Sequence, residues 1–467
     1  MDAFDFVVIG AGPGGYVAAI RGAQNGLRTA VVERDDRLGG TCLLRGCIPT
    51  KSLLHAADVW DTVRRAADFG VATGGGAKLD YAGVRRAQDK VIAQSARGVD
   101  YLMKKNKIEV IRGHGRLAGP GVVEVATVGG PPRTLRAPHV VVATGSVPRQ
   151  IPGLTPDGRR IVTSDELLQL AEPPPSMIVL GGGAVGVEFA SVFSRFGTNV
   201  TVVEMQPTVL PVEDTDVGRE FERLLGKRGV TCLTGCRLAR VEDGPKKTIR
   251  AHLRHGEQDR HVDAAMLLVA IGRAPVTADV GLGAAGVDCD EGGYVTVDAH
   301  MRTSQAGVFA IGDVVRSPWL AHVASAEGTL VADLAAGRPA RPINYLQTPS
   351  CTYAEPEVAS VGLTQRAAEA RGLDVKVGKF PFSAVAKARI GGHTDGFVKL
   401  VMDARYGEIL GVHIIGPRAT DLIAEACVAL RAEMTMEELA NTIHAHPTYA
   451  EALLEGAHAT LGHALHL

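Results

Sequence analysis

The chain has 467 residues, of which 46% are hydrophobic and 22% are charged, so it can bury a large core and is expected to divide into several domains. Its 50 Lys and Arg residues nearly balance its 51 Asp and Glu residues, and the formal net charge is -1. This balance leaves no overall field to attract nucleic acid or anionic lipid, which excludes nonspecific polyanion binding. No apolar run reaches the roughly 18 residues of a membrane span, and acidic residues stand where a secretory signal needs basic ones, so we expect a cytoplasmic protein.

The start of the chain predicts a strand, a glycine turn and a helix. An apolar, β-branched run over residues 4–10 precedes GAGPGG, which holds Gly10, Gly12 and Gly15, and a helical pattern follows. The next strand, RTAVVE, ends at Glu33, 23 residues after Gly10, close to the spacing at which an acidic side chain meets an adenosine ribose. This order predicts a dinucleotide-binding unit.

The same unit recurs 171 residues later in the chain. Its glycines are Gly181, Gly183 and Gly186, and Glu204 again falls 23 residues after the first of them. A single GxGxxG is a weak signal, but two in the same strand, turn and helix context, each with an acidic residue at matching spacing, are not expected by coincidence. We therefore predict two dinucleotide-binding domains.

Three further buried strands are predicted from apolar runs. The segments VVVATGSVP (140–148) and LLVAIGRAP (267–275) each end in a glycine turn, where the chain is expected to leave a nucleotide domain. The segment AGVFAIGDVV (306–315) places Asp313 just beyond the carboxyl end of its strand, where ligands bind in open α/β sheets. From about residue 343 strands and helices mix, which predicts a separate α+β domain.

Two of the seven cysteines, Cys42 and Cys47, stand five residues apart in GGTCLLRGCIPTKSLLHAADVW, at the start of a predicted helix. In an ideal helix this spacing separates the Cα atoms by about 8.6 Å, beyond the ~7 Å limit for a disulfide, so a bond between them requires a distorted first turn. Gly46 and Pro49 permit that distortion, and a helix N-terminus favours the thiolate. Lys51, four residues after Cys47, places a cation on the same helix face.

The CxxxxC motif alone leaves two interpretations open, a redox pair or two unpaired thiols near a buried turn. A zinc site is less favoured because no set of four ligands accompanies the motif. In a reducing compartment a bonded pair is expected to be catalytic rather than structural. The remaining cysteines are expected to be structural: Cys232, Cys236, Cys289, Cys351 and Cys427.

The C-terminal stretch IHAHPTYAEALLEG supplies an imidazole with an acidic partner. His446 can titrate near neutral pH, and Glu451 can orient it and stabilise its charged form, as a base that moves a thiol proton requires. An HxH pair on its own is more often a surface or capping feature than a catalytic one. We assign His444 to support rather than to proton transfer.

The segment GGTCLLRGCIPTK resembles the active-site segment of the pyridine nucleotide–disulfide oxidoreductases, and the two nucleotide units, the ATG turn and AIGDV follow the family's order across nearly the whole chain. This resemblance implies FAD, NAD(P) and a redox disulfide between Cys42 and Cys47. The order HxHPTxxE resembles the signature of the family's dihydrolipoyl dehydrogenases, in which the second histidine is the base and reaches the disulfide of the other subunit. A homodimer follows, and the implied catalytic residues are Cys42, Cys47, Lys51, Glu188, His446 and Glu451. The implied partners are lipoyl carrier domains and the acyltransferase core of a 2-oxoacid dehydrogenase complex, or a glycine cleavage complex.

The resemblance also implies the cofactor-binding residues. Those for FAD are Gly10, Gly12, Gly15, Glu33, Arg34, Gly40, Thr41, Lys51, Gly115, Thr144, Gly145, Ser146, Asp313, Ala321 and His322. Those for NAD are Gly181, Gly183, Val185, Gly186, Glu188, Glu204 and Gly272. No arginine immediately follows Glu204, which favours NAD over NADP. Glu188, which alone would indicate a solvated helix residue, is expected to pair with Lys51 beside the flavin.

The implied fold is α/β, with two Rossmann-like dinucleotide-binding domains, for FAD and NAD, and a C-terminal α+β dimerisation domain. The expected segments are an FAD-binding domain over 1–147, an NAD-binding domain over 148–272, a central segment over 273–342 that completes the FAD site, and an interface domain over 343–467. Leu44 and Arg45 replace the asparagine and valine common in the family, and Arg45 is expected to tune substrate or partner access.

Three alternatives fit less well. Related reductases of glutathione typically use NADPH, and those of mercuric ion add a C-terminal cysteine pair that LGHALHL lacks. A non-catalytic docking flavoprotein is disfavoured because both cysteines, His446 and Glu451 are retained together.

Overall fold

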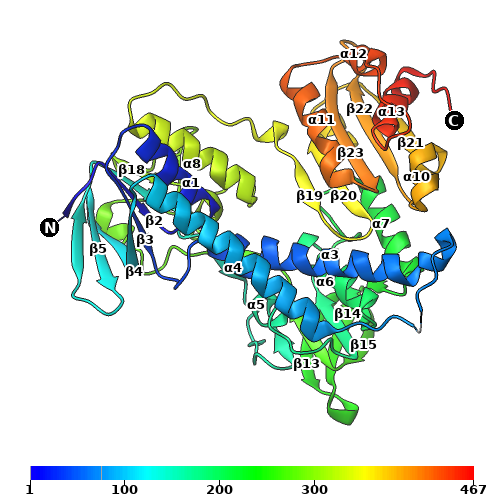
Figure 1. The fold of residues 1–467 in the computed structure, drawn as a ribbon, viewed down its shortest axis with the longest axis horizontal. Coiled ribbons are helices and arrows are strands. Elements are labelled where there is room, and N and C mark those ends of the chain that lie inside the picture. Colours follow the sequence, from blue (N-terminus) through cyan, green and yellow to red (C-terminus); the bar gives the residue numbers. More distant parts are fainter. Residues whose placement is uncertain (1, 75, 467) are drawn as a thin grey trace. The chain divides into compact units, whose positions relative to one another are not determined.

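A computed structural model describes residues 2–74 and 76–466. The chain divides into two compact units, each assembled from separated stretches (Figure 1). The first unit comprises residues 1–52, 82–149 and 273–345, and the second comprises residues 53–81, 150–272 and 346–467. Within the described ranges, no helix combines the length and the apolar composition needed to cross a membrane.

An eight-stranded sheet lies at the centre of the first unit, in the order β1-β6-β5-β4-β3-β2-β7-β18. Its strands are β1 (Asp2–Ala3), β2 (Phe6–Ile9), β3 (Thr29–Glu33), β4 (Glu109–Gly119), β5 (Val122–Thr127), β6 (Arg133–Arg136), β7 (His139–Val142) and β18 (Val308–Ala310). Neighbouring strands from β4 to β18 are parallel, whereas β4, β5 and β6 form an antiparallel meander. Phe6 and Val8 enter one core cluster and Val7 and Ile9 another, so both faces of β2 are covered and its sequence is continuously apolar.

Helices of the first unit pack on this sheet. They are α1 (Pro13–Gln24), α2 (Gly40–Arg45), α4 (Tyr81–Lys105), whose first residue belongs to the second unit, and α8 (Ala321–Ala335). Helix α3 (Cys47–Arg64) begins in the first unit and ends in the second. Helices α1 and α8 lie side by side (Figure 1), and a Cβ at Gly328 would come within 2.5 Å of the Gly14 carbonyl oxygen. Glycine at 328 therefore allows the two backbones to approach each other.

Two short strands, β8 (Ser146–Pro148) and β17 (Arg273–Pro275), pair antiparallel in the first unit. They belong to the two segments in which the chain was predicted to leave a nucleotide domain. The strand β18 is followed by a short 3-10 helix over Gly312–Val314, which carries Asp313 beyond the carboxyl end of the sheet.

A five-stranded parallel sheet in the second unit repeats the central strands of the first. Its order is β12-β11-β10-β16-β9, with β9 (Ile161–Val162), β10 (Ser176–Leu180), β11 (Asn199–Val203), β12 (Thr231–Leu233) and β16 (Met266–Val269). An antiparallel meander of β13 (Arg237–Asp243), β14 (Ile249–His255) and β15 (Gln258–Ala264) accompanies it, as β5 and β6 accompany β4. Its helices are α5 (Ser164–Leu167), α6 (Ala184–Arg195) and α7 (Thr215–Lys227). The predicted pair of Rossmann-like folds is confirmed.

The C-terminal part of the second unit is a five-stranded antiparallel sheet with the order β19-β20-β23-β22-β21. The strands are β19 (Ser350–Thr352), β20 (Glu357–Gly362), β21 (Val375–Pro381), β22 (Phe397–Asp403) and β23 (Ile409–Gly416). The helices are α9 (Gln365–Ala370), α10 (Ala386–Gly391), α11 (Ala419–Arg431), α12 (Met436–Asn441) and α13 (Glu451–Leu461). Helices α11 and α13 pack on the sheet (Figure 1) and share one core cluster with it, so the predicted α+β domain is confirmed.

A buried lysine lies on the opposite face of this sheet. Lys399 alternates along β22 with Val398 and Leu400, which enter the cluster under α11 and α13. The Lys399 side chain is 2% exposed, and its Nζ donates at 2.8 Å both to Asp214 Oδ1 and to Asp216 Oδ2, at the start of α7. A charged contact therefore joins α7 to the antiparallel sheet.

Replacing Lys399 by Met is expected to lower the free energy of unfolding by about 3–5 kcal/mol, because the Asp214 carboxylate, 3% exposed, would remain buried without its counter-charge. Urea denaturation at neutral pH measures the loss. The matched control is Lys379→Met, which removes the ion pair of a 44% exposed lysine with Asp216 and should cost at most about 1 kcal/mol. Equal losses in the two variants would contradict the role given to the buried charge.

The stabilisation that Asp216 provides through its lysine partners is expected to disappear at low pH. Burial alone would raise the pKa of Asp216, but hydrogen bonds from Lys379 and Lys399 lower it from 3.8 to about 2. A carboxyl whose pKa is lower in the folded state stabilises the fold above its ordinary pKa. The stabilisation should therefore be fully present above about pH 4 and disappear as the pH falls through about 2.

Candidate active site

The two cysteines of the CxxxxC motif lie on two separate helices. Cys42 is in α2, Cys47 is the first residue of α3, and Gly46 between them has a non-helical conformation with φ -143° and ψ -109°. A Cβ at Gly46 would lie 2.9 Å from the Thr41 carbonyl oxygen, so the chain folds tightly there. The first turn is thus interrupted rather than merely distorted, and the break brings the cysteines together.

The thiols of Cys42 and Cys47 are hydrogen-bonded to each other. This bond, and then burial, raises the pKa of the Cys42 thiol well above its ordinary value, while the Lys51 ammonium acts in the opposite direction. Three predicted residues of the redox centre therefore lie within one electrostatic environment. Two sulfurs at hydrogen-bonding distance can form a disulfide after a small movement.

The two residues that depart from the family's pattern have packing roles. Leu44 packs against a core cluster of the first unit. Arg45 forms an ion pair of 2.5 Å with Asp35, whose carbonyl oxygen also accepts from Arg112. Arg45 therefore holds the loop after β3 through Asp35. The expected effect of Arg45 on substrate or partner access stays a prediction.

The first glycine loop is closely packed at its outer glycines. Gly10 has a φ of +103°, and a Cβ there would lie 2.3 Å from the Ala143 carbonyl oxygen; a Cβ at Gly15 would lie 1.9 Å from the carbonyl oxygen of Gly10. Gly181 and Gly186 have equivalent contacts in the second loop, at 2.3 Å and 2.0 Å. These positions therefore need glycine for packing within the protein.

The middle glycines of the two loops have open space around them. A Cβ at Gly183 would meet no described atom within 4 Å, and one at Gly12 would meet only the Gly40 Cα, at 3.9 Å. Gly12 and Gly183 precede helices α1 and α6, whose first turns, in the described structure, have no acidic residue and no side-chain cap. Backbone N–H groups at such a helix start bind phosphate, so both loops fit the pyrophosphate of a dinucleotide.

The acidic residues at the ends of the second strands, Glu33 and Glu204, hydrogen-bond the backbone of the neighbouring loops. Glu33 accepts from the backbone N–H groups of Ala11 (2.7 Å) and Asp35 (2.9 Å). Glu204 accepts in the same way from Gly182 and Gln206, both at 2.7 Å. Burial raises the pKa of Glu33, and its hydrogen bonds with backbone N–H groups oppose that rise. Each carboxylate keeps lone pairs for a ribose hydroxyl, so the predicted ribose contacts remain predictions.

Ser146 and Asp313 come together in the first unit. Ser146 Oγ donates to Asp313 Oδ2 at 2.5 Å and accepts from Arg273 Nε at 2.6 Å. Behind Asp313, the backbone N–H of Gly312 donates at 2.7 Å to Glu327 on α8, which is fully buried. Sequence reasoning missed Glu327, although a glutamate within the apolar run of α8 was a detectable signal.

The other predicted residues lie in helices, on a strand and at turns. Glu188 is 4% exposed and accepts from the Tyr353 backbone N–H at 2.9 Å, so it is not a solvated helix residue; its pairing with Lys51 stays a prediction. Gly115 lies on β4 against Val32 and Ile9. The remaining positions are Arg34 after β3, Gly40 and Thr41 at the start of α2, Thr144 and Gly145 after β7, Val185 in the first turn of α6, Gly272 after β16, and Ala321 and His322 at the start of α8.

His446 and Glu451 form a hydrogen-bonded dyad in which the carboxylate orients the imidazole. His446 Nδ1 donates to Glu451 Oε1 at 2.8 Å, and Glu451 Oε2 accepts from the Thr448 backbone N–H at 2.8 Å. Burial alone would raise the pKa of Glu451, but these two hydrogen bonds lower it. With Nδ1 engaged and 71% of its side chain exposed, His446 presents Nε2 for proton transfer.

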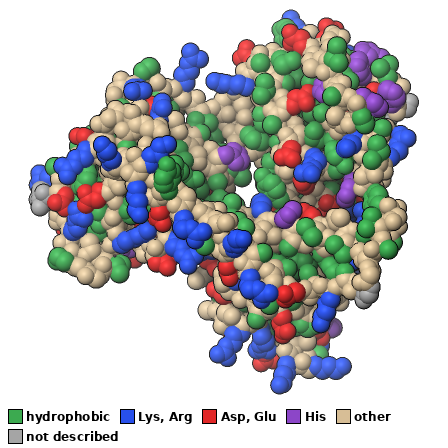
Figure 2. All heavy atoms as spheres, in the orientation of Figure 1, with side chains coloured by type: hydrophobic (Ala, Val, Ile, Leu, Met, Phe, Trp, Pro, Cys, Tyr) green, Lys and Arg blue, Asp and Glu red, His purple; other side chains and the backbone are tan. Residues whose placement is uncertain are grey.

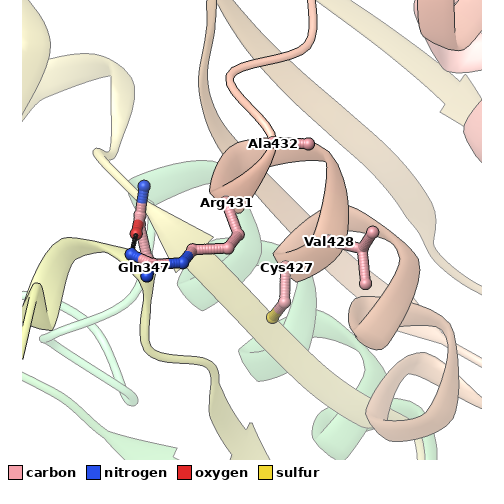
Figure 3. A pocket seen from close by; sticks show the side chains of 5 residues that line it. All are labelled: Gln347, Cys427, Val428, Arg431 and Ala432. Atoms are coloured by element: carbon pink, nitrogen blue, oxygen red, sulfur yellow. Dashed lines mark hydrogen bonds between the residues drawn. The ribbon is translucent and has the colours of Figure 1, made fainter.

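One open hollow of about 400 Å³ lies in the second unit, on helix α11. It is lined by Gln347, Cys427, Val428, Arg431 and Ala432 (Figure 3). Arg431 hydrogen-bonds Gln347 across its edge, and Val428 is 67% exposed. Its lining includes none of the predicted site residues, so the hollow is separate from the candidate active site.

Two dinucleotide-binding folds, a pair of hydrogen-bonded thiols and a histidine–carboxylate dyad define the class of NAD-linked flavoprotein disulfide oxidoreductases. The comparison with protein families agrees. Residues 4–328 match the pyridine nucleotide-disulphide oxidoreductase model, and residues 348–457 match the dimerisation domain of the same family. The chain belongs to the pyridine nucleotide-disulphide oxidoreductase family, and its cofactors are FAD and NAD(H).

Relatives resemble the chain over its whole length. The dihydrolipoyl dehydrogenase of Bacillus subtilis is 44% identical, with 99% of each chain aligned, and that of Chlorobaculum tepidum is 44% identical, with 97% of this chain and 96% of the relative aligned. The crystal structure of LpdA from Mycobacterium tuberculosis superposes with a TM-score of 0.89 at 30% identity, covering 97% of this chain and 99% of the other. The HOCl-induced flavoprotein disulfide reductase RclA from Escherichia coli has a TM-score of 0.85 at 26% identity, with 97% and 99% covered.

Proposed function

We propose that the chain is a dihydrolipoyl dehydrogenase, which oxidises dihydrolipoamide to lipoamide and reduces NAD+ to NADH with release of one proton. The observation that carries the proposal is the hydrogen bond between His446 and Glu451, in a chain that also holds the Cys42–Cys47 pair. Full-length relatives of that name at 44% identity support it.

The chain's own residues supply the thiol chemistry. His446 removes a proton from one substrate thiol, and the thiolate attacks Cys42 Sγ, so that the bond to Cys47 breaks and Cys47 leaves as a thiolate. The second substrate thiol then attacks the substrate sulfur bound to Cys42, and its proton passes to the departing Cys42 sulfur, which releases lipoamide and the Cys42 thiol while His446 keeps the first proton for release to solvent. Lys51 stabilises negative charge at the pair. FAD, when bound, accepts the two electrons of the dithiol and passes them to NAD+.

We assign the cofactor contacts from the fit of the loops. The first glycine loop, Glu33, Ser146 and Asp313 would hold FAD, and the second loop with Glu204 would hold NAD. The predicted roles of Arg34, Gly115, Thr144 and the Ala321–His322 pair belong to the same proposal, as does the division of the chain into four segments.

A homodimer is part of the proposal, with His446 of one copy serving the disulfide of the other. The match of residues 348–457 to a dimerisation domain supports it, and so does the exposed Val428 beside the hollow on α11. A second copy would cover this apolar surface. Lipoyl carrier domains and the acyltransferase core of a 2-oxoacid dehydrogenase complex are the proposed partners, in the cytoplasm.

The test is NAD+ reduction by dihydrolipoamide with purified FAD-loaded protein. Turnover is expected with NAD+ and dihydrolipoamide. Turnover confined to NADPH and glutathione disulfide would move the chain to the glutathione reductases, and no turnover with any disulfide would favour a docking role.

The kcat/KM for NADP+ is expected to be at least ~100-fold lower than the kcat/KM for NAD+. Glu204 accepts two backbone hydrogen bonds, and a 2′-phosphate would have to approach this carboxylate. Initial rates with each nucleotide at saturating dihydrolipoamide measure the ratio. Rates within tenfold of each other would show that Glu204 does not select the nucleotide.

A further inference from the structure

The loop that carries His446 is attached to the rest of the second unit by one buried side chain. Among residues 441–447, all of which the structure describes, only His444 is not exposed, and its side chain is 6% accessible. The adjacent Ile443 is 96% exposed. The buried imidazole of His444 therefore sets the position of this loop, two residues from the base.

Both ring nitrogens of His444 face oxygen acceptors. Nδ1 lies 2.8 Å from the Thr442 carbonyl oxygen, and Nε2 lies 2.7 Å from Glu425 Oε1, on α11. A carbonyl oxygen only accepts, so Nδ1 carries a proton; the carboxylate of Glu425 requires a second proton on Nε2. The ring that satisfies both contacts is an imidazolium. The hydrogen bond to Glu425 raises the pKa of His444, in agreement with this form.

We propose that His444 is a positively charged positioning residue, which fixes the catalytic loop to Glu425 of α11 and holds the His446–Glu451 dyad ready to accept a proton. The proposal rests on the proposed function, in which His446 is the base. A positive charge beside the dyad stabilises the Glu451 carboxylate and disfavours a second positive charge on His446. The charge of Glu425, whose side chain is partly exposed, compensates the charge of the buried His444 ring, so the loop is held without an unpaired buried charge.

Other ionisable groups face the same dyad. His444 interacts electrostatically with Glu451 as well as with Glu425. Glu451 also interacts with His466, which follows α13 and hydrogen-bonds Glu455 at 2.6 Å. Figure 2 shows histidine side chains gathered on the surface at this end of the molecule. Each of the three histidines thus has its own carboxylate, but among them His444 is the most buried.

The decisive variants are His444→Gln, which keeps a polar side chain but removes the charge, and His444→Arg, which keeps the charge and planar donors. His458→Gln on α13 is the matched control. His444→Gln should lower kcat/KM for dihydrolipoamide about tenfold and move the acid limb of the pH–rate profile upward by about 0.5 pH unit or more, because His446 would then hold its proton more readily. His444→Arg should keep the limb near its wild-type position. NADH oxidation by ferricyanide, which needs no thiol base, should stay unchanged in every variant.

A second readout does not depend on the substrate. Diethyl pyrocarbonate modifies neutral imidazole, so the pH at which His446 is half-maximally modified, measured by peptide mass spectrometry, should rise in His444→Gln alone. If wild-type protein fails to oxidise dihydrolipoamide, the proposed function fails, but this modification curve still decides the role of His444.

An acid limb and a modification midpoint within about 0.2 pH unit of wild type in His444→Gln would overturn the proposal. So would an equal shift in His444→Arg, which would indicate packing rather than charge. Should His444→Gln fail to fold, His444→Asn provides the decision, because it removes the same charge with a shorter polar side chain and must also move the limb upward. An unmoved limb in that variant would also overturn the proposal.

Discussion

Replacing Cys47 by Ser is expected to lower NAD+ reduction by dihydrolipoamide by roughly 10³-fold or more. A serine oxygen cannot form the disulfide that the substrate thiolate must open, although it fits the same space at the start of α3. The break at Gly46 places Cys47 against Cys42. Steady-state rates of the FAD-loaded variant measure the loss.

Thiol counting separates loss of the redox pair from loss of the fold. Oxidised wild-type protein, denatured without reductant, should show five reactive thiols of its seven cysteines, and all seven after reduction. Cys47→Ser should show six in both states. Cys289→Ser, which changes an exposed thiol, is the matched control and should keep wild-type turnover. Two thiols lost on oxidation in Cys47→Ser would point to a different disulfide.

Replacing His446 by Gln is expected to lower the same activity by about 10²–10⁴-fold, the usual contribution of a positioned base. Glutamine fits beside Glu451 but cannot accept the thiol proton. The pH–rate profile should also lose its acid limb, because the group that must be neutral has been removed. Hydrogen bonds from His446 and Thr448 outweigh burial and keep the pKa of Glu451 below its ordinary value, so its carboxylate is already ionised where an imidazole titrates.

The control for His446→Gln is NADH oxidation by ferricyanide, which uses the flavin and nucleotide sites without a thiol base. This rate should match wild type. His393→Gln, a change of a histidine that is 46% exposed elsewhere in the same domain, should leave both activities intact. A His446→Gln variant that oxidises dihydrolipoamide within tenfold of wild type would show that another group removes the proton.

Much of the fold was predictable from local patterns. Continuously apolar runs such as residues 6–9 identify strands covered on both faces, and Gly10 and Gly181 identify turns that no other residue fits, because a Cβ would collide with a carbonyl oxygen. The repeat of glycine and glutamate spacing predicted two similar sheets. The strand orders β4-β3-β2-β7-β18 and β12-β11-β10-β16-β9 agree with that prediction. These signals are local, so the sequence alone carries them.

The roles of several polar side chains were decided only by the tertiary structure. The spacing predicted that Glu33 and Glu204 lie near a ribose. In the structure their buried carboxylates also accept hydrogen bonds from the backbone of the glycine loops. Glu327 and Lys399 were not recognised, because each finds its polar partner outside its own helix or strand. Hydrogen bonds between distant segments leave no periodic pattern.

The sequence by itself determined the family, the two glycine loops and the pairs Cys42–Cys47 and His446–Glu451, because short motifs with fixed spacing encode each of them. The charge state of His444 could not be predicted in this way. It depends on Glu425, which lies 19 residues away and reaches the ring only because α11 and the C-terminal loop pack on the same domain. Tertiary packing decided which carboxylate each histidine faces, because electrostatic contacts depend on distance in space and not on distance along the chain.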